Sequence, residues 1–122
     1  MKLFSRKTEN IAWSVLENET DLEVAIKHSY SQPIAIFKHS IRCGISSMVK
    51  YNLERAWDID PTEVKPYYLD LINYRSVSNL IAEKLGVPHQ SPQIILLKDG
   101  EVLHHTSHQA ISASKVKDAL AA

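Results

Sequence analysis

The only cysteine of the chain, Cys43, lies among residues that favour a reactive thiol. Lys38, His39 and Arg42 place positive charge near it in the sequence. We expect Cys43 at the start of a helix, where unpaired backbone N–H groups and the positive end of the helix dipole favour thiolate over thiol. Thiolate is the form that attacks disulfides, so the spacing predicts a nucleophile. The alternative is the commoner one for a lone cysteine, a small buried apolar side chain.

Two predicted elements position this cysteine. Ile34–Phe37 is a short apolar run after Pro33, which is typical of a parallel strand buried on both faces. From Ile45 onward, apolar residues recur every three to four positions, which predicts an amphipathic helix. Its predicted apolar face comprises Ile45, Met48, Val49, Leu53, Ala56 and Trp57. Cys43 therefore falls in a strand-to-helix junction.

The flanking segments predict further alternation of strands and helices. Residues 11–16 show a weak period of two, and residues 66–71 alternate well enough for a strand. Thr20–Glu23 has the capping-box pattern, so we expect a helix from there to about Tyr30. Ser76 is the expected N-cap of a helix that stops at Gly86.

The last third of the chain predicts a β-hairpin and a closing helix. Strands over residues 93–98 and 101–106 are joined by the turn residues Asp99 and Gly100. Ser112 is the expected cap of the final helix.

The predicted fold class is α/β, with a central mixed β-sheet flanked by helices, a C-terminal β-hairpin and a closing helix. We expect a single domain over residues 1–122, allowing for a flexible start at residues 1–10. The order of elements resembles that of thioredoxin-like domains. By that resemblance, Ser91-Pro92 takes the place of the cis-proline that faces the active-site cysteine.

Composition excludes several classes of protein. Lys and Arg together number 14, as do Asp and Glu, so no global positive field would attract nucleic acid or an anionic membrane. The first residues lack the apolar core of a signal peptide, and we expect a cytoplasmic protein. One cysteine cannot form an internal disulfide, so any disulfide must be made with a partner or a small thiol.

Three segments together resemble the YtxJ family of bacillithiol-system thioredoxin-like proteins, also called monothiol bacilliredoxins. They are Phe37–Ser46, which contains Lys-His-Ser ahead of the cysteine and Ile-Ser behind it, then Ser91-Pro92-Gln93, and then His105–His108. The family commonly has proline directly after the cysteine, where this chain has Gly44.

The resemblance implies a thiol-disulfide oxidoreductase that removes bacillithiol or a similar small thiol from mixed disulfides. Cys43 would be the catalytic residue and would attack the sulfur of the small thiol. The residues implied to stabilise the thiolate or bind the substrate are Lys38, His39, Arg42, Gly44, Ser46, Ser91, Pro92 and Gln93.

The implied partners are S-thiolated client proteins, a small thiol as co-substrate, and a second redoxin or reductase that regenerates Cys43. No bound cofactor, metal, nucleic acid or membrane is expected.

Two other functions remain open on the sequence. Cys43-Gly44-Ile45-Ser46 differs by one residue from the Cys-Gly-Phe-Ser of monothiol glutaredoxins, which bind an iron–sulfur cluster between two subunits. This suggests an iron–sulfur or metal carrier, but the Gly-Gly-containing glutathione site of that family has no counterpart here. The third possibility is a non-catalytic thioredoxin-like binding module in which Cys43 only packs.

Histidines near the C-terminus raise the question of a zinc site. His104 and His105 should point to opposite faces of their strand, which makes a joint site with His108 improbable.

Overall fold

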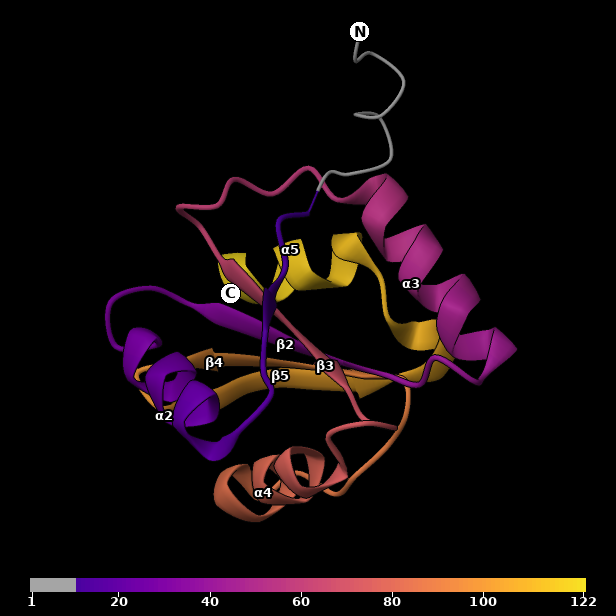
Figure 1. The fold of residues 1–122 in the computed structure, drawn as a ribbon. Helices are drawn as coiled ribbons and strands as arrows, with labels where there is room; N and C mark the ends of the chain where they lie inside the picture. The colour runs from indigo at the N-terminus through magenta and orange to yellow at the C-terminus, as the bar shows by residue number, and fades with distance from the viewer. Residues whose placement is uncertain (1–10) are drawn as a thin grey trace, which may run out of the picture.

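In the computed structural model, which describes residues 11–122, a five-stranded mixed sheet lies between two layers of helices (Figure 1). The strand order is β1-β3-β2-β4-β5, with β1, β3 and β2 parallel and β4 and β5 antiparallel to their neighbours. The strands are β1 (Ser14–Val15), β2 (Ile34–His39), β3 (Lys65–Asp70), β4 (Gln93–Lys98) and β5 (Glu101–Ser107). The expectation of a flexible start falls on residues 1–10, outside the described residues.

The helices cover both faces of the sheet. They are α2 (Glu19–His28), α3 (Gly44–Ala56), α4 (Arg75–Leu85) and α5 (Ala113–Ala121), with a 3₁₀ turn, η1 (His108–Ala110), before α5. Helices α3 and α5 lie on one face, and α2 and α4 lie on the other (Figure 1). The predicted α/β class, element order, hairpin and closing helix are confirmed.

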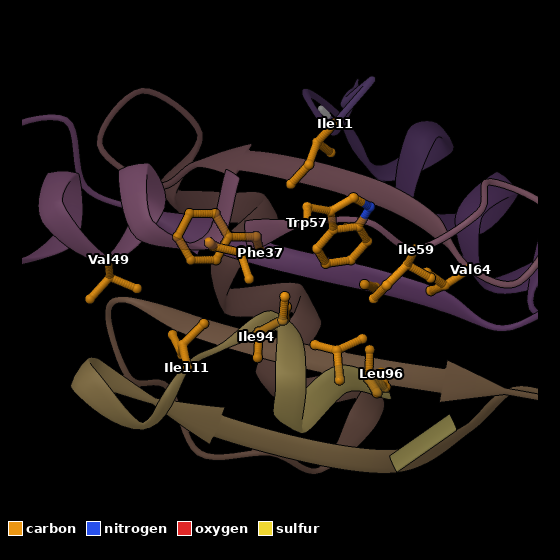
Figure 2. Packing of buried hydrophobic residues seen from close by; sticks show 13 residues of the cluster. Ile11, Phe37, Val49, Trp57, Ile59, Val64, Ile94, Leu96 and Ile111 are labelled. Atoms are coloured by element: carbon orange, nitrogen blue, oxygen red, sulfur yellow. The ribbon is translucent and has the colours of Figure 1, made fainter. Parts of the chain in front are cut away.

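Alternation along the central strand β2 builds two hydrophobic cores. Ala35 and Phe37 face α3 and α5, whereas Ile34 and Ile36 face α2 and α4, and all four are completely buried. Figure 2 shows the first core, in which the Trp57 side chain lies among residues from several elements. Each large apolar side chain removed from water stabilises the fold by about 1.5–3 kcal/mol.

Predicted turn and cap residues occupy their expected places at three points. Gly86 ends α4 in the left-handed conformation at φ 69°, which glycine adopts at little cost. Asp99 and Gly100, both with positive φ, connect β4 to β5. The Ser112 side chain accepts the backbone N–H of Lys115 at 3.1 Å and caps α5.

Two predicted N-caps were wrong. Helix α2 is capped by Asn18 rather than Thr20, because the Asn18 side chain accepts the Asp21 N–H at 2.8 Å. The N-cap of α4 is Tyr74 rather than Ser76. There the Asp70 carboxylate accepts backbone N–H groups just after β3, and the resulting tight turn leads into the helix before Ser76 is reached.

The predicted apolar face of α3 was wrong in part. Val49, Leu53 and Trp57 are buried, but Ile45 is 49% exposed and Met48 is 64% exposed. Helical geometry allows only one stripe of side chains to reach the sheet, and the first turn of α3 lies past the ends of the strands (Figure 1). Ala56, which was also predicted for this face, is exposed as well.

None of the helices in residues 11–122 has the length and apolar character needed to cross a bilayer.

Candidate active site around Cys43

Cys43 is the N-cap residue of α3 and is half-buried. Its backbone N–H donates to the Ser40 carbonyl at 3.2 Å, and its own carbonyl accepts the Ser47 N–H at 3.0 Å. Cys43 therefore stands at the start of the helix, as the sequence predicts, although its side chain makes no hydrogen bond to the N–H groups of the first turn.

The buried hydroxyl of Ser46 holds the loop that carries Cys43. Its Oγ accepts the Ser40 N–H at 3.1 Å and lies 2.7 Å from Nδ1 of His39. A hydroxyl has one proton to give, so Ser46 can accept from Ser40 while donating to an unprotonated His39 Nδ1. These contacts join the end of β2, the loop and α3 into one hydrogen-bonded unit.

His39 is in an apolar, aromatic environment. Its ring stacks on Phe37 and lies 5.7 Å from the ring of Tyr68, measured between centroids. Burial lowers the pKa of His39 below its ordinary value, and the charge of Lys50 lowers it further, against a weaker opposite effect of Asp70 and Glu54. At neutral pH this histidine is therefore uncharged, which fits its role as the acceptor of the Ser46 proton.

Lys38 lies on the opposite face of the sheet from its neighbour His39. Its side chain is completely buried, and Nζ donates to the Ser78 carbonyl at 3.2 Å and lies 3.3 Å from Nδ1 of His89. Burial lowers the pKa of Lys38 to about 8. Arg42, by contrast, is exposed in the loop before Cys43.

The Ser91–Pro92 peptide bond is cis, as the resemblance implied. Pro92 is buried and its carbonyl accepts the His108 N–H at 3.0 Å, whereas Ser91 is half-buried. Gln93 is buried, and its side-chain amide donates to the Pro88 carbonyl at 3.1 Å. Because β4 is antiparallel to β2, these residues enter β4 at the same edge of the sheet where β2 delivers Cys43.

An exposed apolar surface borders Cys43. Ile41, Ile45 and Met48 are each about half exposed or more. Next to them, a groove of about 220 Å³ lies between the start of α3 and η1, lined by Gly44, Ile45, Met48, Val49, Asn52, Gln109 and Ile111. The spacing of apolar residues predicts that Ile45 and Met48 face the core, so this surface does not follow from the sequence.

The C-terminal histidines do not converge. His104 pairs with Leu96 and His105 with Ile95, two residues that belong to opposite cores, as the alternation predicted. No three His, Cys, Asp or Glu side chains of the part that the structure describes, residues 11–122, gather closely enough to hold a metal ion.

His89 and Ser78 surround the Lys38 ammonium group and were not predicted as site residues from the sequence. The available signal was alternation in β2, which places Lys38 on the face of Ile34 and Ile36. It indicates the face but not the partner, since His89 is 51 positions away in the sequence.

Comparison with solved structures shows the thioredoxin fold. A protein with this fold to which an oxidoreductase activity has been ascribed is 27% identical, with a TM-score of 0.73 over 86% of this chain and 90% of the other. A thioredoxin from Malassezia sympodialis is 15% identical, with a TM-score of 0.70 over 93% of this chain and 91% of the other. Fasciola hepatica thioredoxin is 18% identical, with a TM-score of 0.67 over 88% of this chain and 95% of the other.

Residues 14–116 match the family described as Monothiol bacilliredoxin BrxC. This match covers most of the chain and confirms the bacilliredoxin part of the predicted resemblance, while the YtxJ name stays a prediction. The single cysteine at the start of α3 agrees with the word monothiol. The chain therefore belongs to the monothiol bacilliredoxin family.

Proposed function

We propose that this protein is a thiol-disulfide oxidoreductase that removes bacillithiol, or a similar small thiol, from mixed disulfides with client proteins. The observation that carries the proposal is the position of Cys43, half-buried as the N-cap of α3, in a chain of the monothiol bacilliredoxin family. We propose that Cys43 attacks as the thiolate, and its half-buried position leaves the sulfur partly accessible to a second sulfur.

The reaction is a pair of thiol-disulfide exchanges. The Cys43 thiolate attacks the small-thiol sulfur of the mixed disulfide, a bond forms between these two sulfurs, and the client sulfur leaves as a thiolate that takes a proton from water. A second small thiol then attacks the adduct, frees Cys43 and leaves as a small-thiol disulfide. The small thiol is thus the reductant, and a second redoxin or a reductase can replace it.

The neighbouring side chains divide the remaining tasks. Ser46 and His39 hold the loop so that Cys43 stays at the helix start. Arg42 is exposed and can pair with the carboxylates of bacillithiol. The more flexible Gly44 replaces the usual proline and lines the apolar groove next to Cys43.

The client protein needs a surface of its own. Ile45 and Met48 offer exposed apolar area beside the thiol. Ser91, Pro92 and Gln93 enter β4 at the same end of the sheet, and this segment is proposed to contact the client segment. We propose that the reaction takes place in the cytoplasm, on one domain spanning residues 1–122.

The test follows the mass of both proteins. Reduced protein is mixed with a bacillithiolated model client, and with a glutathionylated client as a control for small-thiol preference. We expect the adduct to move to Cys43 in equimolar amount, faster for bacillithiol, and turnover to require added thiol. Cys43→Ser should abolish the transfer, whereas Ser47→Ala, an exposed change in the same turn, should not. Release of client thiol without an adduct on Cys43, or no release at all, would overturn the proposal.

A further inference from the structure

The buried ammonium group of Lys38 has only uncharged hydrogen-bond partners within residues 11–122. Its Nζ lies 3.2 Å from the Ser78 carbonyl oxygen and 3.3 Å from Nδ1 of His89. An ammonium group can only donate, so His89 Nδ1 must be an unprotonated acceptor. The Ser78 hydroxyl, 3.4 Å from the same nitrogen, can also donate to it. The geometry therefore assigns the proton of a neutral His89 to Nε2.

Lys38 and Gln93 together hold the loop that leads to Pro92. They are register partners on the adjacent strands β2 and β4, so their side chains lie on one face of the sheet. Lys38 contacts His89. The Gln93 amide donates to the carbonyl of Pro88, the residue before His89, at 3.1 Å. Two consecutive loop residues are thus tied to the two strands that deliver Cys43 and Pro92. We call residues 87–92 the proline loop.

We propose that Lys38 is a positioning residue for the proline loop, acting through its contact with His89, and that protonation of His89 releases the loop. This inference rests on the proposed function, because it gives the client-binding edge of that same site a dependence on pH. A released loop no longer offers a fixed edge to the client segment, so transfer from a client should slow in acid.

The charges around His89 determine the direction of the pH effect. Lys38 approaches it from β2 and Arg75 from α4, and Gln93 of β4 carries no charge. Burial, then Lys38, then Arg75 hold the pKa of His89 below its ordinary value. The neutral form that accepts from Lys38 is therefore the form present at neutral pH. The contact is complete at neutral pH and is lost as the pH falls through this lowered pKa.

Three variants separate the contact from the charge. Lys38→Met removes the ammonium group but keeps a buried unbranched side chain. His89→Asn keeps an acceptor near the position of Nδ1 but cannot titrate, and His89→Ala removes the acceptor. His89 is only partly buried and belongs to neither hydrophobic core, so neither of its substitutions leaves a cavity among the apolar side chains.

The first measurement is amide hydrogen exchange of His108, whose N–H donates to the Pro92 carbonyl of the proline loop at 3.0 Å, at pH 7.5 and pH 5, corrected for intrinsic exchange rates. For one lost hydrogen bond we expect protection in the unmodified protein to drop about fivefold on acidification. In Lys38→Met and His89→Ala the protection should be low at both pH values. In His89→Asn it should stay high at both. Unchanged protection in Lys38→Met, or an undiminished pH response in His89→Asn, would overturn the inference.

The second measurement is the rate of adduct transfer from a bacillithiolated client, divided by the rate of Cys43 alkylation by iodoacetamide. Alkylation requires no contact with a client protein. Dividing by its rate therefore removes differences in the reactivity of the thiol and leaves the effect of the proline loop on the client. We expect the ratio to follow loop protection across the variants. A constant ratio despite changed protection would refute the positioning role. If no variant transfers the adduct, the proposed function fails, while the exchange data still decide whether the contact holds the loop.

Discussion

Ser46→Ala should weaken the fold more than its small size suggests, because Ser46 has no exposed area and serves two partners. The change removes the acceptor of the Ser40 N–H and the partner of His39 Nδ1, at 3.1 Å and 2.7 Å. A buried polar group left unpaired costs about 1–3 kcal/mol. His39 is buried and Ser40 only half-buried, so we expect a loss of about 2 kcal/mol in the free energy of unfolding.

Urea unfolding followed by circular dichroism measures this loss. With a slope of roughly 2 kcal/mol per molar urea for a chain of this size, the midpoint should fall by about 1 M. Ser47→Ala is the matched control, since it is in the same helical turn, is exposed and gains the same alanine helix propensity of about 0.5 kcal/mol. Subtracting the control therefore leaves the cost of the lost contacts.

The same variant tests whether the contacts keep Cys43 at the helix start. In a loosened loop, Cys43 should spend less time at the start of α3, near its N–H groups. The rate of Cys43 alkylation by iodoacetamide should therefore be lower in Ser46→Ala than in Ser47→Ala. If the two variants have equal urea midpoints and equal alkylation rates, the reasoning about Ser46 is refuted.

Three further predictions concern other parts of the molecule. Ile45→Lys should slow adduct transfer from a protein client but not from a small-molecule disulfide, in a stopped-flow assay in which Val24→Lys, an equally exposed change on α2, has no effect. Because the pKa of Lys38 is lowered to about 8, the unfolded chain binds more protons just above that pH, and urea unfolding should show stability rising from pH 8 toward pH 10. Lys38→Met should lack that rise, and a rise that persists in this variant would show that Lys38 does not cause it. Above pH 10 stability should fall again, because the pKa of Tyr68 is raised to about 12 in the folded protein. Leu53→Ala should lower the free energy of unfolding by about 3 kcal/mol in the same experiment, because Leu53 is almost completely buried. A loss below about 1 kcal/mol would contradict the tight packing of Leu53 against the sheet.

Local signals in the sequence were sufficient for the elements that bring Cys43 to a helix start. The apolar run at Ile34–Phe37, the period of the following helix and the Asp99-Gly100 turn each depend on residues within a few positions of one another. The same is true of the stop at Gly86, where the left-handed backbone favours glycine. The N-cap of α2 was missed because Asn18 and Thr20 are both residue types that cap helices. That of α4 was missed because the turn at Asp70 starts the helix at Tyr74, which has no capping side-chain bond.

The tertiary structure alone decided which groups meet at the site. Lys38 and His39 are neighbours in the sequence, yet one contacts His89 of the proline loop and the other contacts Ser46 of α3. The strand order β1-β3-β2-β4-β5 brings these segments together, and no local pattern encodes it. The exposure of Met48 likewise depends on where α3 lies relative to the sheet and η1. The sequence by itself thus determined the strand and the helix that flank Cys43. Long-range packing determined the surroundings of Cys43, because side-chain partners are chosen by proximity in space.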